Sequence, residues 1–233
     1  MRRIGLLAPM KPELRPLARR LGATSRGAPP GFVTARADRT RYFATVTTMG
    51  TAAAAAATER LLALGDVDHV VVCGIAGGIS PDVHIGDVLV PETVLDVRTG
   101  DELVTAPLGN ATRAGTIATS DELLFAEEIA SRLGTRGLLA IDMESAGVGR
   151  ACNAHGVPWT VFRGVSDHLA DREVDDAIFR LAKPDGSGNM GAVLKFVVTQ
   201  PSRVPSLVRL GRGMTLAADR AAEAALRACG EAP

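Results

Sequence analysis

Residues 69–78 read HVVVCGIAGG, an almost unbroken apolar run that passes directly into a glycine-rich segment. An apolar run of this kind predicts a strand that is buried on both faces, as the strands of parallel sheets are. The glycines at 74–78 predict a tight turn after the strand, or a close approach of the backbone to a ligand. Their spacing differs from the G-x-G-x-x-G of a dinucleotide site, and the ISPD that follows does not resemble the start of a helix. We therefore do not expect NAD binding.

Strands and helices alternate on both sides of this segment. Further strands are expected at residues 4–8, 42–48, 87–91, 116–119, 138–141 and 159–165. Helices are expected at 12–21, 51–64, 121–133 and 142–155, with Gly22 ending the first and Thr51 capping the second. Residues 24–41 are typical of a loop or an edge hairpin, and 190–229 of two helices joined near 201–205. The alternation predicts the α/β class, a mainly parallel sheet covered on both faces in three layers.

The composition favours a single domain, residues 1–233, with 190–229 as its C-terminal helices. Apolar residues make up 46% of the chain and the formal net charge is zero, so a nucleic-acid partner is not expected. Cys73, Cys152 and Cys229 match no zinc motif and fit a reducing cytoplasm better than a disulfide framework. No segment approaches the roughly 20 apolar residues of a membrane span, and the N-terminal apolar run is too short for a signal sequence. We expect a cytoplasmic protein that binds no metal ion.

Acidic and hydroxyl side chains gather where the expected strands end. Glu13 follows the first strand, Asp142 to Ser145 follow the strand at 138–141, and Ser166-Asp167 follow the strand at 159–165. Ligands of such folds bind beyond the carboxyl ends of the strands. Three segments that are distant in the sequence are therefore expected to meet in one pocket.

Each of these acids also has a purely structural interpretation. Asp142 can cap the helix that follows it, because acids favour a helix N-terminus. Asp167 can be an N-cap or lie in a surface turn, and Glu13 can be an ordinary acid of a first helical turn. Glu144 is harder to explain in this way, since it ends a strand beside the apolar Met143. His168 is expected to be an ordinary histidine.

Taken together, four segments resemble the 5′-methylthioadenosine/S-adenosylhomocysteine nucleosidase family, within the wider group of purine nucleoside and uridine phosphorylases. They are GLLAPMKPEL at 5–14, GIAGGISPDVHIGDVLVP at 74–91, IDMES at 141–145 and RGVSD at 163–167. The similarity runs from Ile4 to about Asp171. It implies a nucleoside phosphorylase-like fold, three-layer α/β/α with a mixed central sheet. It also implies a homodimer and a site that releases adenine from a small-molecule nucleoside without a cofactor.

The resemblance assigns catalytic roles residue by residue. Glu13 matches the glutamate that activates the attacking water, and Glu144 matches the glutamate that binds the ribose hydroxyls. Asp167 matches the aspartate that donates a proton to purine N7. The substrate-binding positions that it implies are Met143 against the sugar, Ser166 beside Asp167, Gly77 and Ile75 in the glycine segment, and Leu123 and Leu124 in the base pocket.

Three departures from the family pattern bear on the substrate. Leu123 stands where an aromatic residue often stacks on the base, and Ile75 stands where a serine is common. The segment 93–114 is short and lacks the aromatic residues that help to enclose small 5′-thioether groups. The 5′ substituent therefore stays open among methylthioadenosine, adenosylhomocysteine, a lipid-linked adenosine and futalosine.

The residue types fit the breaking of an N-glycosidic bond through a cation resembling an oxocarbenium ion. The related reaction of O-glycosidases uses two carboxyls, and a substrate that spans base and sugar makes three reasonable. An ordinary aspartate has a pKa of about 3.9, so Asp167 can protonate the base only if its surroundings raise its pKa or if it shares a proton with the purine. Phosphate would need several fixed donors, and Lys11 and Arg163 are the few cations in these loops. Water is favoured, with a phosphorylase and a non-catalytic purine binder as the alternatives.

The tail carries a second resemblance. KPDG at 183–186, GAVL at 191–194 and QPSRVPSLVRL at 200–210 look like the tail of the hopanoid-associated branch, which implies an adenosylhopane nucleosidase in hopanoid biosynthesis. Apolar residues and arginines alternate over 203–218, which favours a transient contact with a membrane surface. The alternative is a terminal helix that packs on the sheet.

Overall fold

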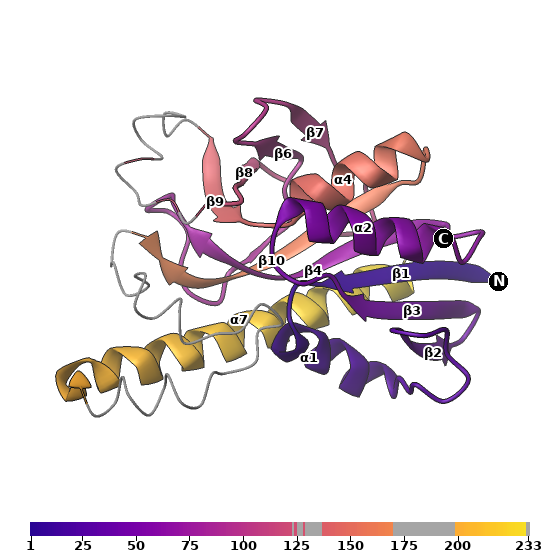
Figure 1. Ribbon diagram of the computed structural model, residues 1–233, viewed down its shortest axis with the longest axis horizontal. Helices are drawn as coiled ribbons and strands as arrows, with labels where there is room; N and C mark the ends of the chain where they lie inside the picture. The colour runs from indigo at the N-terminus through magenta and orange to yellow at the C-terminus, as the bar shows by residue number, and fades with distance from the viewer. Residues whose placement is uncertain (123, 125–127, 129–136, 170–198, 232–233) are drawn as a thin grey trace.

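The computed structural model describes residues 1–122, 124, 128, 137–169 and 199–231 and shows three layers (Figure 1). Helices α2 (Thr51–Leu62) and α4 (Ser145–Ala154) cover one face of a central sheet, while α1 (Lys11–Leu21) and α7 (Val204–Glu231) cover the other. The strands are β1 Arg2–Ala8, β2 Val33–Ala37, β3 Thr40–Val46, β4 His69–Gly78, β5 Val88–Leu89, β6 Thr93–Asp96, β7 Glu102–Val104, β8 Thr116–Thr119, β9 Leu138–Asp142 and β10 Trp159–His168. The α/β class and the hairpin expected within 24–41 are confirmed.

The sheet is mixed, as the resemblance implied. Its main path runs β2-β3-β1-β4-β9-β8-β6-β7, with β10 paired to β4 and β5. The β1–β3, β1–β4, β10–β4, β6–β8 and β8–β9 pairs are parallel, and the β2–β3, β4–β9, β6–β7 and β10–β5 pairs are antiparallel. Strand β4 lies at the branch point, because it pairs with β1, β10 and β9.

Strand β4 is longer than expected. The predicted turn at 74–78 is wrong, because these residues continue the strand and pair with β10 and, at Gly77 and Gly78, with β9. The glycines serve close approach instead of a change of direction. A Cβ atom on Gly74 would stand 2.2 Å from Glu13 Oε2 and 2.5 Å from Arg163 Nη1. The glycine allows charged side chains to lie directly against the strand.

Strand β10 also runs further than expected. It continues past Val165 to His168, with a register shift against β4 between Val165 and Asp167. The placement of Asp167 after the strand is therefore corrected: it lies inside the strand at this irregularity. A bulge redirects the side chains of a strand, and bulges are common next to active sites.

The capping of α2 is supplied from outside the helix. The prediction that Thr51 caps α2 is wrong, because Thr51 is the first helical residue and Gly50, with φ 99°, is the N-cap. Asp121 accepts hydrogen bonds from the Thr51 backbone N–H at 2.6 Å and from Thr51 Oγ1 at 2.7 Å. The end of α1 follows expectation, since Gly22 adopts the left-handed conformation.

The core explains why the 69–73 run is apolar without alternation. Val70 and Val72 belong to the apolar cluster beneath α2 and α4, whereas Val71 and Cys73 belong to the cluster beneath α1 and α7. Both faces of β4 are thus covered by helices, as expected for a buried strand. All three cysteines are free and buried, and burial raises the pKa of each thiol.

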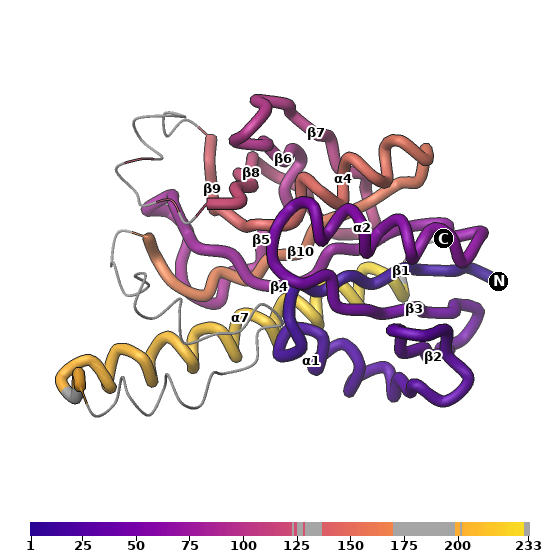
Figure 2. Tube along the Cα trace, viewed as in Figure 1, coloured from indigo at the N-terminus to yellow at the C-terminus, as the bar shows by residue number. Residues whose placement is uncertain are grey.

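The second of the two expected tail helices is α7, preceded by the short 3-10 turn η2 (Pro201–Arg203). Its C-terminal half packs on the sheet through alanines, among them Ala217, Ala221 and Ala225, which are fully buried. The first turns of α7 extend beyond the sheet, and both chain ends lie at the opposite edge (Figure 2). The first tail helix and most of the helix expected at 121–133 lie outside the described residues. No described helix has the length and apolarity needed to cross a membrane.

Candidate active site

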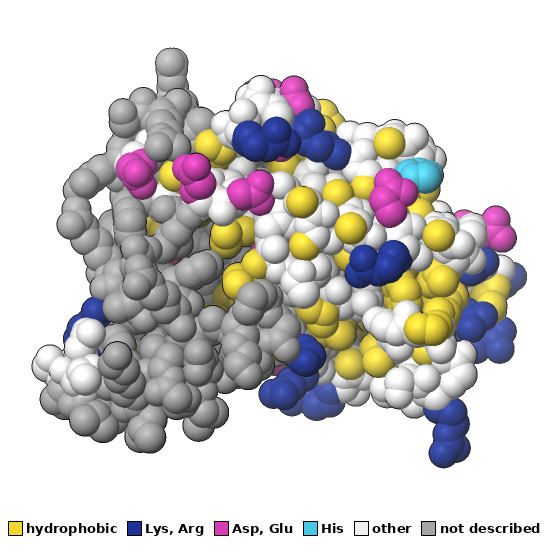
Figure 3. Space-filling model, viewed as in Figure 1, with side chains coloured by type: hydrophobic (Ala, Val, Ile, Leu, Met, Phe, Trp, Pro, Cys, Tyr) yellow, Lys and Arg dark blue, Asp and Glu magenta, His cyan; other side chains and the backbone are white. Residues whose placement is uncertain are grey.

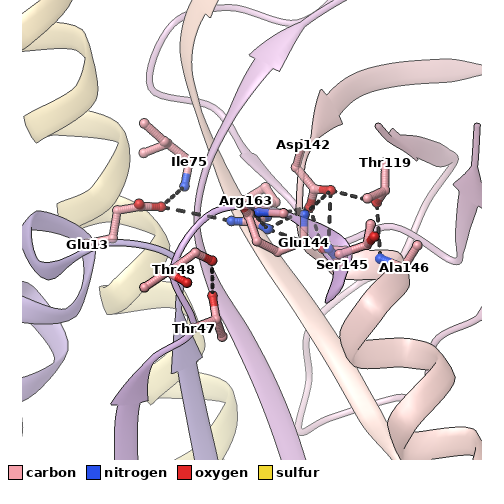
Figure 4. Close-up of polar contacts among 12 residues, drawn as sticks. Glu13, Thr47, Thr48, Ile75, Thr119, Asp142, Glu144, Ser145, Ala146 and Arg163 are labelled. Atoms are coloured by element: carbon pink, nitrogen blue, oxygen red, sulfur yellow. Dashed lines mark hydrogen bonds and ion pairs between the residues drawn. The ribbon is translucent and has the colours of Figure 1, made fainter. Parts of the chain in front are cut away.

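A buried cluster of charged side chains forms where β9, β10 and the start of α1 meet (Figure 4). Glu13 lies in the first turn of α1, Asp142 is the last residue of β9, and Glu144 is the N-cap of α4. Arg163 lies in the middle of β10 and is completely buried. The expected meeting of Glu13 with the segment 142–145 is confirmed.

Arg163 stands at the centre of this cluster. Its Nε lies 2.8 Å and its Nη2 2.7 Å from Asp142 Oδ2, and Nη2 also lies 3.1 Å from Glu144 Oε2. Its Nη1 lies 3.9 Å from Glu13 Oε2. Arg163, one of the cations considered above for phosphate, is bound here by carboxylates. A charged residue inside the apolar strand TVFRGV was the signal, because buried charges are retained where they have partners.

The charge balance of the cluster holds protons on its acids. Three carboxylates face one guanidinium, so full ionisation would leave excess negative charge away from water. Burial raises the pKa of Glu13 to about 8 against the attraction of Arg163, with the charge of Glu144 adding to the rise. Burial likewise raises the pKa of Glu144 to about 7, and the charge of Asp142 adds to it. Glu13 is the carboxylate farthest from Arg163 and has the higher pKa of these two.

Two unpartnered atoms mark one place in the site. Within the described part of the chain, Glu13 Oε1 and Arg163 Nη1 are buried and have no hydrogen-bond partner. One is an acceptor when Glu13 is ionised and the other is a donor. Glu13 Oε2 is occupied by the backbone N–H of Ile75 at 2.8 Å. A polar molecule bound to this pair would accept from Arg163 and donate to Glu13.

Glu144 is bounded by the loop between β3 and α2. Its Oε1 accepts from the backbone N–H of Gly50 at 3.4 Å. Thr48 in this loop has φ 67°, which is unusual for a β-branched residue, and Thr47 Oγ1 donates to its carbonyl at 2.8 Å. Strained backbone of this kind occurs at binding sites.

Asp167 and Ser166 lie further along β10, with exposed fractions of 8% and 3%. Ser166 Oγ donates to Asp167 Oδ1 and also lies 3.3 Å from the carbonyl of Ala76. Gly77 pairs with Asp167 across the strands, and a Cβ atom on it would stand 3.7 Å from Asp167 Oδ2. Gly77 also pairs with Ile141 of β9, so β4 separates Asp167 from the segment that carries Glu144.

The other residues expected to bind the substrate differ in where they lie. Ile75 contacts the cluster through its backbone N–H, and Met143 is half-buried between Asp142 and Glu144. Leu124 is buried against Ala118 and Leu138. Leu123 lies outside the described residues.

The fold and this site together define a nucleoside phosphorylase-like α/β protein. The family model of the phosphorylase superfamily matches residues 3–111 and 104–199. The chain belongs to the phosphorylase superfamily.

Named relatives and solved structures refine this placement. A 5′-methylthioadenosine/S-adenosylhomocysteine nucleosidase of Aeromonas salmonicida is 28% identical over 169 residues, covering 58% of this chain and 72% of the relative. A futalosine hydrolase of Streptomyces coelicolor is 32% identical over 159 residues, covering 55% and 67%. The structure of a methylthioadenosine/adenosylhomocysteine nucleosidase of Colwellia psychrerythraea in complex with adenine superimposes with a TM-score of 0.73 at 20% identity, covering 99% of this chain and 96% of that one. At this identity the match shows a shared fold.

Proposed function

We propose that this chain hydrolyses the N-glycosidic bond of a 5′-substituted adenosine and releases adenine. The observation that carries the proposal is the buried Glu13–Arg163 pair, with one unpartnered atom on each side chain, next to Glu144. The named relatives support it, because they are a nucleosidase and a hydrolase of nucleosides. A site that can hold a water molecule beside a sugar-binding carboxylate suits this reaction.

Glu144 is proposed to hold the ribose hydroxyls. Its Oε2 is bound by Arg163 and its Oε1 by the Gly50 N–H, so both oxygens have a fixed direction. Each oxygen has a second lone pair that can accept from a hydroxyl. Its ionised form also stabilises the positive charge that develops on the sugar as the bond breaks.

Glu13 and Arg163 are proposed to hold the attacking water. Arg163 Nη1 donates to the water oxygen, while Glu13 Oε1 accepts one of its protons and takes that proton as the water attacks. This step requires ionised Glu13, and burial raises the pKa of Glu13 to about 8. A base with a pKa near the working pH is well matched to proton transfer.

Asp167 is proposed to protonate the leaving purine at N7. Ser166 Oγ, which lies against Asp167 Oδ1, orients the carboxyl. The other oxygen, Oδ2, lies on the side of Gly77, where the side chain of Leu169 also packs. Met143, Leu123 and Leu124 are proposed to line the sugar and base sites, as the resemblance implied.

Water is proposed as the nucleophile in place of phosphate. The described contacts place one cation, Arg163, against three carboxylates, and its Nε and Nη2 are already bound. Phosphate binding needs several converging donors, and carboxylates repel it. The site as described offers phosphate one unpartnered donor.

The test is an assay of adenine release from methylthioadenosine, adenosylhomocysteine and futalosine-type nucleosides, each with and without phosphate. Adenine release at the same rate in both conditions, with free sugar as the second product, is the expected result. An absolute requirement for phosphate, with a sugar 1-phosphate as product, would make the chain a phosphorylase. A lack of base release from every substrate would contradict the proposal.

A second candidate substrate is a lipid-linked adenosine such as adenosylhopane. The observation in its favour is a patch on the outer side of α7, where Val208 is 47% and Leu216 42% exposed. Ile85, 41% exposed, lies beside it, since Gly86 approaches Leu216 and Gly213 approaches Ile85. Arg209 and Arg212 are on the same exposed turns of the helix. An apolar patch with arginines suits transient contact with a membrane surface.

This candidate is tested by surface substitutions on α7. Truncation after Gln200 would be uninformative, because the buried alanines of α7 belong to the core. Val208→Asp with Leu216→Asp should instead slow hydrolysis of adenosylhopane in vesicles and leave methylthioadenosine hydrolysis unchanged. Equal rates on the lipid substrate before and after substitution would remove this candidate.

We also propose that the chain acts as a homodimer in the cytoplasm, with no nucleic-acid partner. The resemblance of the four segments supports the dimer, and symmetric dimers are the commonest oligomers.

A further inference from the structure

We propose that Asp142 is a positioning residue for this reaction: it holds the guanidinium of Arg163 so that Nη1 points at Glu13. The inference rests on the proposed function, in which Arg163 and Glu13 hold the attacking water. Asp142 itself touches neither Glu13 nor the place between their unpartnered atoms in the described contacts. Its effect on Glu13 would pass through Arg163.

The carboxylate of Asp142 is held by donors on both oxygens. Oδ1 accepts from Thr119 Oγ1 at 2.6 Å and from the backbone N–H groups of Glu144 and Ser145 at 3.3 Å each. Oδ2 accepts from Arg163 Nε at 2.8 Å and from Ser145 Oγ. The side chain is 1% exposed. A carboxylate bound in this way cannot rotate without losing several hydrogen bonds at once.

The two oxygens separate a capping role from a positioning role. The contacts of Oδ1 are with the backbone N–H groups of Glu144, the N-cap of α4, and of Ser145, its first residue, so they support the start of the helix although Asp142 is not its N-cap. The contacts of Oδ2 with Arg163 and Ser145 do not involve the backbone of the helix and are not needed for capping. Ser145 Oγ in turn accepts from Arg163 Nη2 at 3.3 Å. Oδ2 thus binds the guanidinium directly and also through Ser145.

Binding Nε and Nη2 determines where the third nitrogen lies. A guanidinium is planar, so fixing two of its nitrogens fixes the direction of the remaining one. Nη1 is left as the unpartnered donor, 3.9 Å from Glu13 Oε2. Asp142 therefore sets the direction of Nη1, because Glu13 does not lie within hydrogen-bond distance of it.

Thr119 extends the same arrangement by one residue. It ends β8 directly opposite Asp142 of β9 and is fully buried. Its Oγ1 accepts from the backbone N–H of Ala146 at 3.2 Å, so its hydroxyl hydrogen is directed to Asp142. Thr119→Val should reproduce part of the Asp142 defect while keeping the shape of the side chain.

The inference also predicts a change in titration. The groups that face one another here are Glu13 from α1, Asp142 from β9, Glu144 from α4 and Arg163 from β10, with the neutral thiol of Cys73 from β4 beside Glu13. The attraction of Arg163 lowers the pKa of Glu13, and the charge of Asp142 raises the pKa of Glu144. With Asn at 142, Nη1 is no longer held toward Glu13, so the pKa of Glu13 should rise, whereas the pKa of Glu144 should fall because a neighbouring negative charge is lost.

The experiment compares Asp142→Asn with a matched control, Asp96→Asn. Asp96 is a buried aspartate at the end of β6, which β8 separates from β9. It is bound to Arg150 at 2.6 Å and to two backbone N–H groups, and it lies outside the site. Asp142→Asn should lower kcat by ~10²-fold with little change in KM, as expected for misplacement of a reacting group. The pH at which kcat/KM reaches half its maximum should move higher in Asp142→Asn, because Glu13 must be ionised, and should stay in place in Asp96→Asn.

Two further measurements keep the inference testable. In a double-mutant cycle, Asp142→Asn should add little to Arg163→Gln, since each removes the same function. Carbon-13 NMR titration of the glutamate carboxyls should show a higher pKa for Glu13 in Asp142→Asn, whether or not any substrate is turned over. Additive losses, or a Glu13 pKa equal to or below that of the parent protein, would overturn the inference. A parent protein without nucleosidase activity would overturn the proposed function alone, because the titration would still report on Asp142.

Discussion

The chemistry at the scale of single residues depends on unequal sharing of one positive charge. Arg163 gives two nitrogens to Asp142 and Glu144, and its contact with Glu13 is the longest of the three. Glu13 is therefore the acid least compensated and can act as a base near neutral pH. The same inequality makes the roles of the three carboxylates separable by substitution.

Asp167→Asn should reduce turnover by roughly 10²–10⁴-fold, which is the usual value of general acid catalysis. The amide keeps the shape of the side chain and can still meet Ser166, but it cannot deliver a proton. Binding of a non-hydrolysable adenosine analogue, measured by calorimetry, should change little. A variant that turns over within a few-fold of the parent would exclude Asp167 as the proton donor.

Glu13→Gln and Glu144→Gln should both cripple the reaction, but with different effects on binding. Glu13→Gln removes the base and should leave nucleoside affinity nearly unchanged. Glu144→Gln loses the charge that holds the ribose and should weaken affinity as well as turnover. Calorimetry on the two variants distinguishes them, and the opposite pattern would mean that the two roles are exchanged.

At the scale of elements, the close crossing of α7 over β10 supports the end of the strand that carries Asp167. A Cβ atom on Gly164 would stand 2.2 Å from the carbonyl of Ala217, and one on Gly213 would stand 2.3 Å from the carbonyl of Ser166. The helix lies directly against the backbone beside the proposed proton donor. Small residues at this crossing are needed on both elements.

Two glycines of α7 offer a matched test of this crossing. Gly211→Ala should raise the free energy of unfolding by about 0.5–1 kcal/mol, because a Cβ atom there meets nothing within 4 Å and alanine favours the helix. Gly213→Ala should lower it by about 1–3 kcal/mol through overpacking and should also reduce kcat. Denaturant titration and adenine-release assays measure both effects. Equal changes in unfolding free energy and kcat for the two variants would show that the crossing of α7 and β10 tolerates a side chain at position 213.

At the scale of the whole molecule, buried titratable groups make stability depend on pH in two directions. On the face in Figure 3, Lys and Arg side chains lie in separate small groups among acidic and apolar ones, so no single charged field dominates the described part of that face. The buried groups matter more. Burial lowers the pKa of His69 to about 4, and its Nε2 lies 2.8 Å from Thr160 Oγ1.

The lowered pKa of His69 and the raised pKa values of the two glutamates change stability in opposite directions with pH. The unfolded chain binds more protons at His69, so stability falls as pH drops from 6.5 towards 4. The folded chain binds more protons at Glu13 and Glu144, so stability falls as pH rises from 4.5 through about 7 and 8. Above pH 6.5 only the glutamates contribute among these three, and stability should decrease while activity increases.

The substitution Glu13→Gln tests whether ionisation of Glu13 lowers the stability at high pH. At pH 8.5 this variant should be more stable than the parent by on the order of 1 kcal/mol, since it never carries a buried charge. Near pH 4 the difference should largely vanish, because Glu13 is then protonated in the unfolded chain as well. Thermal unfolding at the two pH values measures it, and an equally large difference at both would mean that ionisation of Glu13 is not the cause.

We also predict that the whole molecule is a homodimer in solution. Light scattering at assay concentration should give twice the mass of one chain, because the resembled family forms homodimers. A fully active monomer would contradict this.

Local patterns in the sequence were enough to predict the α/β class and most element positions, and the family resemblance named Glu13, Glu144 and Asp167, whose roles stay predictions. The reason is that burial periodicity, the glycine stop of α1 and the IDMES and RGVSD segments are properties of short stretches. The roles of Gly74, Asp121 and Arg163 came only from the tertiary structure. Each of them acts on a partner at least 21 residues away: Gly74 admits Glu13, Asp121 caps α2, and Arg163 binds Asp142. No short stretch records such a partner, because the packing of separate elements creates the contact.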